Sequence, residues 1–372
     1  MEGSRGILII THPQDLHAFL VQEALAQKGH TVDLLHTSDF PQRSSKAVLE
    51  EQTHLFRGPD MELRDLRPEV VWWRRPVSVT LPDWLHPNDT EFARSECRHF
   101  FSWFWEALSD SGFWVNPYAS RLRSENKILQ QRAALRAGLE VPPTLYSNDP
   151  MEILRFIRGN GGEVVYKPLR PHNATWREDN RVEALYTSLL TEDLLPDEEI
   201  LALTPGIFQQ HVRKKHELRV VVFGSEIFAA KIKSQQTVRG KLDFRAAYDE
   251  LSLEPAEIPP YIEKACLSIL DQLGIVTGSF DLIVTPEDRY VFLEVNPQGQ
   301  FLWVEAYTGQ PILDTFCEFL IRKGRVPEQR EVRPQIRLTE VETKAFQRQE
   351  RAQAEHVLAY PPEAPPIKKA AS

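Results

Sequence analysis

The stretches SFDLIV at residues 279–284 and YVFLEVNP at residues 290–297 decide the fold of the C-terminal half of the chain. Both are rich in β-branched and aromatic residues, which is typical of β-strands. The first stretch carries Asp281, and the second carries Glu294 and Asn296. Because side chains alternate along a strand, Glu294 and Asn296 point to the same face. We therefore expect an antiparallel hairpin with one polar face.

The connection between the two stretches sets their register. If residues 286–289 form the turn, Thr285 faces Tyr290. Counting back residue by residue then places Asp281 opposite Glu294. The opposite face would carry four apolar side chains, those of Phe280, Leu282, Leu293 and Val295.

The polar face of this hairpin has the composition of a metal site. Asp281, Glu294 and Asn296 offer two carboxylates and an amide, which are hard oxygen donors suited to Mg²⁺. The alternative is a solvated strand face, but it would leave Asp281 and Glu294 side by side as repelling carboxylates. The sequence therefore predicts a Mg²⁺ site formed by these three residues.

Two lysines occur where a phosphate group could be bound. Lys167 ends the strand-like run at residues 164–167, directly before Pro168. Lys127 falls in the first turn of an expected helix, where a cation is unfavourable beside the helix dipole. Either lysine alone would be read as a surface residue, but both together with the carboxylate strands predict nucleotide phosphate binding. The chain has neither a P-loop motif nor a Rossmann fingerprint.

The N-terminal region alternates strands and helices. Residues 6–10 read as a buried strand, residues 15–28 as a helix that stops at a glycine, and residues 31–36 as a second strand. This order predicts a parallel βαβ unit. A further strand is expected at residues 70–73, and Asn88 is the expected N-cap of the helix that follows.

Beyond about residue 118 the pattern changes. Ser124 is the expected N-cap of a helix that runs to Ala137, and residues 163–167 form a strand of a small α/β module. Further strand-like runs indicate an antiparallel sheet at residues 207–212, 218–223 and 227–232. We expect four parts: an N-terminal domain over 1–118, a central module over 119–205, a C-terminal sheet domain over 206–328, and a charged, mostly mobile tail over 329–372.

Composition limits the class of protein. The 372 residues include 44 Lys and Arg against 53 Asp and Glu, so the net charge is −9 and a broad nucleic-acid surface is not expected. The three cysteines form no CxxC motif, which argues against a zinc site or a disulfide framework. No apolar stretch is long enough for a signal peptide or a membrane span. These features predict a cytoplasmic protein with no membrane or nucleic-acid partner.

The order of these features resembles the ATP-grasp carboxylate–amine ligases over roughly residues 1 to 325. More narrowly, three longer motifs resemble the ring-forming ligases of microviridin and the wider graspetide group: VWWRRP at 71–76, DFR at 243–245 and NPQGQFLWVE at 296–305. The resemblance implies an α/β fold that becomes α+β in its C-terminal part. Its parts would be an N-terminal βαβ pre-ATP-grasp domain, a small central α/β module and a C-terminal antiparallel-sheet domain.

The resemblance also implies roles for individual residues. Arg219 would steady the transferring phosphoryl group and the acyl phosphate, together with Lys167. Asp281, Glu294 and Asn296 would bind Mg²⁺. The residues implied to bind ATP are Lys127, Lys167, Gln209, Gln210, His211, Val212 and Glu217.

Members of that group activate Asp or Glu side chains of a ribosomal precursor peptide with ATP. A Ser or Thr hydroxyl then gives an ω-ester ring, and a Lys amine gives an ω-amide ring. The precursor peptide would be the partner of this chain, which is expected to form a homodimer. Candidate peptide-binding residues, for which a solvated strand is the alternative, are Lys231, Lys233, Arg239, Asp243 and Arg245.

Two other functions remain open from the sequence. One keeps the fold and chemistry but joins an amino acid to a small molecule or a protein terminus, as the ribosomal-protein glutamate ligases do. The other is a nucleotide-binding regulator without turnover, which would not require both lysines, Arg219 and all three metal ligands. The chain also departs from the group, which usually has an acidic residue at the position of Lys231 and Trp at that of Phe244, and substrate choice would differ accordingly.

Overall fold

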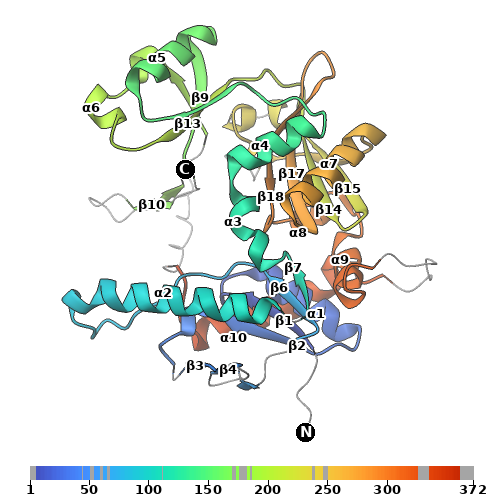
Figure 1. Cartoon of the computed structure of the whole chain (residues 1–372). Helices are drawn as coiled ribbons and strands as arrows, with labels where there is room; N and C mark the ends of the chain where they lie inside the picture. The colour runs from blue at the N-terminus through green and yellow to red at the C-terminus, as the bar shows by residue number, and fades with distance from the viewer. Residues whose placement is uncertain are drawn as a thin grey trace, which may run out of the picture. The chain divides into compact units, whose positions relative to one another are not determined.

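The structure is a computed structural model, shown in Figure 1. Its backbone forms two compact units: unit 1 comprises Met1–Arg121, Ile275–Thr277 and Pro311–Ser372, and unit 2 comprises Leu122–Gly274 and Gly278–Gln310. The residues it describes are 6–43, 45–50, 54–58, 62–64, 68–110, 112–169, 173–175, 182–184, 187–236, 239–245, 250–325 and 335–360. None of the helices in these ranges is long and apolar enough to cross a membrane.

Unit 1 is built on a parallel sheet with the strand order β2-β1-β6-β7. Its strands are β1 (Ile7–Thr11), β2 (Val32–His36), β6 (Val70–Trp73) and β7 (Phe113–Val115). Helix α1 (Leu16–Gln27) connects β1 to β2, which confirms the predicted βαβ unit. Every residue of the inner strand β1 is buried, as is usual where helices cover a parallel sheet.

The remaining elements of unit 1 surround this sheet. A small antiparallel sheet contains β3 (Lys46–Leu49), β4 (His54–Arg57) and β5 (Glu62–Arg64). The helices are α2 (Pro87–Ser109), α9 (Ile312–Ile321) and α10 (Leu338–Glu355), with short 3₁₀ turns η1 (Thr37–Asp39) and η2 (Tyr118–Ser120). The N-cap of α2 is His86 rather than Asn88, because Pro87 already has the backbone angle of a first helical residue.

A buried ion pair lies at the carboxyl ends of β1 and β6. Arg74 directly follows β6, and its side chain binds Asp15 through Nε–Oδ2 at 3.0 Å and Nη2–Oδ1 at 3.3 Å. The side chains are 0% and 2% exposed, respectively. Although burial opposes ionisation, the field of Arg74 lowers the pKa of Asp15 to about 2. The WWRRP motif therefore has a structural part to play in unit 1.

Within the tail that was expected to be mostly mobile, residues 335–360 contain a packed helix, while residues 329–334 and 361–372 lie outside the described residues. Helix α10 lies against α1, and its apolar side chains, such as Val341 and Ala345, are buried. Figure 1 shows α10 in red beside the blue sheet. The chain beyond α10 is also held, because Asp39 Oδ1 accepts a hydrogen bond from the Val357 backbone N at 2.9 Å. The apolar residues of α10 recur at helical spacing within a highly charged sequence, so they form one apolar face. Burial of this face explains why the segment is ordered rather than mobile.

Unit 2 contains a small antiparallel sheet in the order β12-β9-β13-β8. Helix α5 covers one face of it through Ile153 and Ile157. The register places Thr144, Lys167 and Gln209 together on the other face. The elements of this region are β8 (Thr144–Ser147), α5 (Pro150–Gly159), β9 (Glu163–Lys167), β10 (Asn173–Thr175), β11 (Val182–Ala184), β12 (Ser188–Thr191), η3 (Glu192–Leu194), α6 (Glu198–Leu201) and β13 (Gly206–Gln210).

Two consecutive helices precede this sheet, α3 (Arg121–Glu125) and α4 (Lys127–Arg136). The N-cap of α4 is Asn126, whose Oδ1 accepts a hydrogen bond from Leu129 N at 3.1 Å. The predicted N-cap, Ser124, instead belongs to α3. The break between the two helices falls at Asn126, two residues later than expected. Lys127 is nevertheless the first residue of α4, so the prediction of a lysine in the first helical turn is confirmed.

A larger antiparallel sheet in the order β16-β15-β14-β17-β18 forms the second part of unit 2. Helix α4 lies against α7 and β18. The elements are β14 (His216–Phe223), β15 (Glu226–Ile232), η4 (Ser234–Gln236), η5 (Arg239–Lys241), β16 (Leu253–Ala256), α7 (Pro260–Leu273), β17 (Thr277–Val284), β18 (Tyr290–Asn296) and α8 (Leu302–Thr308).

The β17–β18 hairpin pairs Asp281 with Glu294, as predicted, but by a different route. At the turn, Val284 rather than Thr285 pairs with Tyr290, and an irregularity between Asp281 and Leu282 restores the expected pair. The extra residue also changes the apolar face, because Phe292 is fully buried where Leu293 was expected. Both the turn register and the burial of Leu293 were therefore predicted wrongly.

Candidate active site

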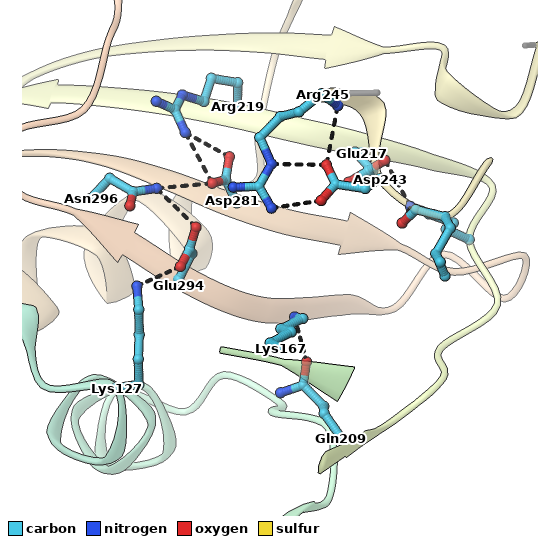
Figure 2. A network of polar contacts seen from close by, with 12 residues as sticks. Lys127, Lys167, Gln209, Glu217, Arg219, Asp243, Arg245, Asp281, Glu294 and Asn296 are labelled. Carbon is cyan, nitrogen blue, oxygen red and sulfur yellow. Dashed lines mark hydrogen bonds and ion pairs between the residues drawn. The ribbon is translucent and has the colours of Figure 1, made fainter. Parts of the chain in front are cut away.

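Three polar side chains meet on one face of the β17–β18 hairpin. The Asn296 amide donates through Nδ2 to Asp281 Oδ2 at 3.0 Å and to Glu294 Oε1 at 3.1 Å. Figure 2 shows this amide between the two carboxylates. The pairing of Asp281 with Glu294 and the shared face of Glu294 and Asn296 bring these groups together, although they come from two strands.

The composition of this cluster fits a Mg²⁺ ion. In the part of the chain that the structure describes, no group of three or more His, Cys, Asp or Glu side chains could hold a metal. Asp281, Glu294 and Asn296 supply two carboxylates and one amide, so water and phosphate oxygens would complete the six positions that Mg²⁺ prefers. The amide hydrogens of Asn296 occupy the place between the carboxylates to which a cation would be attracted.

The two carboxylates have opposite pKa shifts. Burial raises the pKa of Asp281, although the adjacent Arg219 acts against this effect. Burial also disfavours the charged form of Glu294, but Lys127 and Arg245 outweigh it and hold the pKa of Glu294 well below its usual range. Glu294 is therefore the more firmly ionised of the pair.

Arg219 connects the carboxylates to the loop after β18. Its Nη1 donates to both carboxylate oxygens of Asp281, at 2.8 and 3.0 Å, and its Nη2 donates to Gln300 O at 2.8 Å. Its buried Nε has no hydrogen-bond partner among the described residues. A buried donor without a partner is costly, so this atom is available to an anionic ligand.

Gly299 allows this loop to approach Arg219 closely. A Cβ atom at position 299 would lie 3.0 Å from Arg219 Nη2 and 2.8 Å from Ser279 Cβ. Trp303 also lies near the guanidinium, with Arg219 Cζ 6.0 Å from its ring centroid, and stacks on Phe244. The sequence analysis did not assign a role to Gly299 or Trp303, although both lie within the motif at 296–305.

Two lysines reach the carboxylates from different elements. Lys127 of α4 forms an ion pair with Glu294, which explains a cation in the first turn of a helix. Lys167 of β9 donates to Gln209 Oε1 at 2.8 Å, and burial lowers its pKa. The charges of both lysines act on Glu294, as does that of Arg245. Positive charge from four elements therefore surrounds two carboxylates.

The segment implied to bind ATP, residues 209–212, begins in β13 and runs past its end. Gln210 N donates to Pro143 O at 2.9 Å, and His211 Nδ1 lies 2.7 Å from Glu163 Oε1. Val212 continues this segment toward β14 without being part of either strand. Gln209 directs its side chain toward Lys167 instead.

Glu217 of β14 is buried against Lys214, with Nζ–Oε1 at 2.8 Å. Burial raises the pKa of Glu217, although the ammonium group of Lys214 acts against this effect. Lys214 also donates to Leu242 O at 2.9 Å and so ties β14 to the segment at 239–245. The sequence analysis missed Lys214, because nothing in the local pattern marks a lysine that bonds to a carbonyl 28 residues away.

The five peptide-binding candidates fall into separate groups. Arg245 binds Asp243 through two bonds, Nε–Oδ1 at 2.8 Å and Nη2–Oδ2 at 2.6 Å, near the carboxylate cluster. Lys231 and Lys233 both bind Glu254, at 3.0 and 2.6 Å.

The register separates Lys231 from this cluster. Lys231 pairs with Leu218, which is adjacent to Arg219 in β14, so Lys231 and Arg219 point to opposite faces of the sheet. The side chain of Arg239 lies outside the described residues.

Comparison with known proteins identifies the family of this chain. Residues 6–121 match the family model of the MvdD pre-ATP grasp domain. The chain is 30% identical to the macrocyclase MdnC of Microcystis aeruginosa, solved with its precursor peptide MdnA, at a TM-score of 0.74 over 85% of this chain and 99% of that one. It is 28% identical to a RiPP-associated ATP-grasp ligase of Chryseobacterium gregarium, solved with ADP and a leader and core peptide, at a TM-score of 0.76 over 88% and 99%.

A curated relative is named as a glutamate ligase. The probable alpha-L-glutamate ligase 2 of Shewanella amazonensis is 26% identical over 212 residues, which are 56% of this chain and 67% of that protein. The chain belongs to the ATP-grasp ligases, within the group of RiPP macrocyclases that includes MdnC.

Proposed function

We propose that this chain is an ATP- and Mg²⁺-dependent ligase that closes rings in a ribosomally made precursor peptide. The observation that carries the proposal is the cluster in unit 2, in which Lys127, Lys167 and Arg219 approach the paired carboxylates Asp281 and Glu294. Its relatives MdnC and the Chryseobacterium ligase were solved with precursor peptides. We infer that the same class of substrate reaches this cluster.

The reaction would proceed in two steps. An Asp or Glu side-chain oxygen of the peptide attacks the γ-phosphorus of ATP, which forms an acyl phosphate and releases ADP. A Ser or Thr hydroxyl, or a Lys amine, of the same peptide then attacks the acyl carbon, loses its proton and displaces inorganic phosphate. The peptide loses one water in total, because one oxygen and two hydrogens leave with the phosphate and the released proton.

The residues of the cluster have distinct parts in this proposal. Lys127 and Lys167 would bind ATP phosphates, and the free Nε of Arg219 would stabilise the charge on the transferring phosphoryl group. Asp281, Glu294 and Asn296 would hold Mg²⁺, which supplies positive charge near the phosphate oxygens. The backbone of Gln210, His211 and Val212 would receive adenine, with Glu217 nearby.

Asp243 and Arg245 are the proposed contacts for the peptide. Their bidentate pair lies close enough to the cluster for the charge of Arg245 to act on both Glu294 and Asp281. A guanidinium held by one carboxylate can still offer its remaining N–H groups to a second carboxylate, such as the side chain to be activated. Lys231 and Lys233 would contact parts of the peptide away from the reacting group.

The test uses a candidate precursor peptide rich in Thr, Ser, Asp and Glu, to be sought among the small open reading frames beside this gene. Intact-mass spectrometry after incubation with ATP and Mg²⁺ should show the loss of ~18 Da for each ring, with one ADP for each loss. Mild base should restore the lost mass if the rings are esters and should not if they are amides. An unchanged peptide mass, together with ADP formation, would contradict ring closure.

A second function has support from the Shewanella relative, whose name places it among glutamate ligases. The same cluster would then activate the carboxylate of a small substrate or a protein terminus for attack by an amino acid. ADP release that requires free glutamate or another free amino acid, without a peptide, would favour this function over the first.

A further inference from the structure

Three side chains form a hydrogen-bonded row on the face of the small sheet in unit 2 that lies opposite helix α5. Lys167 of β9 donates through Nζ to Gln209 Oε1 of β13 at 2.8 Å. Gln209 in turn donates through Nε2 to Thr144 Oγ1 of β8 at 3.0 Å. Figure 2 shows the first of these contacts, where the Gln209 side chain lies beneath the Lys167 ammonium group. The row therefore crosses three strands and ends at Lys167, which is proposed to bind ATP phosphates.

The direction of each hydrogen bond in this row is set at Thr144, the end of the row away from Lys167. Thr144 Oγ1 donates its single proton to Pro142 O at 2.8 Å, and a carbonyl oxygen can only accept. The same hydroxyl can therefore only accept from its other partners, Gln209 Nε2 and Gln131 Nε2, both at 3.0 Å. Gln209 must direct its NH₂ group to Thr144 and its oxygen to Lys167. The hydrogen-bond network thus fixes the orientation of the Gln209 amide.

A neutral acceptor has a particular consequence for Lys167. Lys127 has its charge balanced by the Glu294 carboxylate, whereas the direct partner of Lys167 is an uncharged amide. The amide holds one N–H of the ammonium group in place and does not neutralise it. Gln209 is 3% exposed, so water does not substitute for this contact. Lys167 therefore keeps further N–H groups for a ligand.

We propose that Gln209 and Thr144 are positioning residues that hold Lys167 for binding of the nucleotide phosphates. The inference rests on the proposed function, in which Lys167 contacts ATP. It assigns to Gln209 a different part from contact with the adenine, since the side chain acts through the lysine. Thr144 acts one step further away, by fixing the orientation of the Gln209 amide.

Nucleotide binding to the full-length protein tests the proposal without any peptide. Calorimetry should show that Gln209→Met and Thr144→Val each weaken ADP binding in the presence of Mg²⁺ by about tenfold, the effect of losing one hydrogen bond to a charged group. Both variants should bind adenosine as the wild type does, because Lys167 would contact only phosphate. Thr144→Ser, which keeps the hydroxyl, should restore ADP binding.

The control is Gln131→Met. Gln131 donates to the same Thr144 hydroxyl, but its contact does not lead to the lysine. Its ADP affinity should equal that of the wild type, and thermal melts should show that all variants fold. Because Thr144 and Gln209 act in series, the double variant should be no weaker than either single variant.

Three results would overturn the inference while leaving the ligase function intact. Adenosine binding that weakens together with ADP binding would show that Gln209 contacts the nucleoside. Wild-type ADP affinity in Thr144→Val would show that the row does not matter, and a roughly hundredfold loss in the double variant would show independent effects. A wild-type protein that binds no ADP would instead overturn the proposed function, together with the inference that rests on it.

Discussion

Unit 1 and unit 2 each bury an arginine–carboxylate pair, but the two pairs have different surroundings. In unit 1, Arg74 and Asp15 are 0% and 2% exposed, and Thr11 donates a third hydrogen bond to the same carboxylate. In unit 2, Arg219 and Asp281 are 7% and 14% exposed, and Glu294 lies directly opposite Asp281. The first pair balances its own charge, whereas the second belongs to a larger group of charges.

The difference shows how a structural ion pair can be told from a binding site. Two like charges held side by side destabilise a fold unless another group compensates them. In unit 2 the compensation includes Lys127 and the Asn296 amide, yet Arg219 Nε has no partner among the described residues. An arrangement that stores repulsion and leaves a buried donor free is typical of a ligand site.

The largest expected effect comes from removing one of the paired carboxylates. Glu294→Gln keeps the shape of the side chain but removes a proposed Mg²⁺ ligand and the partner of Lys127. We expect Mg²⁺-dependent ADP formation to fall by roughly 10³-fold or more, with an unchanged melting temperature. Normal turnover in this variant would contradict the metal assignment.

Breaking the pair in unit 1 should instead affect stability. Arg74→Met leaves the buried Asp15 carboxylate without its ion-pair partner, so the free energy of unfolding should fall by about 3–5 kcal/mol. Urea denaturation monitored by tryptophan fluorescence would measure this loss. The double variant Arg74→Met with Asp15→Asn should recover part of it. A loss below about 1 kcal/mol would show that this pair stabilises the fold no more than a solvent-exposed ion pair does, which would contradict the prediction.

Arg219→Ala should separate chemistry from binding. If the free Nε of Arg219 stabilises charge that develops during phosphoryl transfer, kcat should fall by roughly 10²-fold while the affinity for ATP is retained. Steady-state kinetics together with calorimetry would measure the two quantities. An ATP affinity that falls in step with the rate would make Arg219 a nucleotide ligand.

Acidification should weaken unit 1 through two histidines. Burial lowers the pKa of His12 to about 4 and that of His36 to about 3. The unfolded state, with a histidine pKa near 6.5, therefore binds more protons below that pH, and folding stability falls as pH drops from 6.5 toward 4. Each histidine should cost about 2 kcal/mol at pH 5 relative to pH 7.

Denaturant titrations at the two pH values would measure this change. The variant His36→Gln should lose about half of the pH dependence, since only His12 would still take up a proton on unfolding. Equal pH dependence in this variant and the wild type would show that His36 is protonated in the folded state.

The hairpin that carries Asp281 and Glu294 shows how far local sequence can predict a site. Alternation of side chains and an approximate turn were enough to pair the two carboxylates. The turn register was nevertheless wrong by one residue, and an irregularity between Asp281 and Leu282 compensated for it. Such a bulge leaves no clear pattern in the sequence, because it depends on how both faces of the strand pack.

Other parts of the site depended on contacts between distant segments. Lys231 and Arg245 were both predicted as peptide-binding residues, but the register of β14 with β15 directs Lys231 away from the face that carries Arg219. Lys214 had no local signal, since its partner Leu242 is far along the chain. Gln209 was expected to bind ATP, and only the structure shows that its side chain contacts Lys167.

The sequence by itself determined the chemical groups and their local placement: two carboxylates and an amide on neighbouring strands, and a lysine at the start of a helix. These features depend on backbone periodicity, which acts over a few residues. Only the tertiary structure decided which cation meets which carboxylate and which lysine keeps an uncharged partner. Those outcomes depend on strand register and on the hydrogen bond from Gln209 to Thr144, which join residues far apart in the chain.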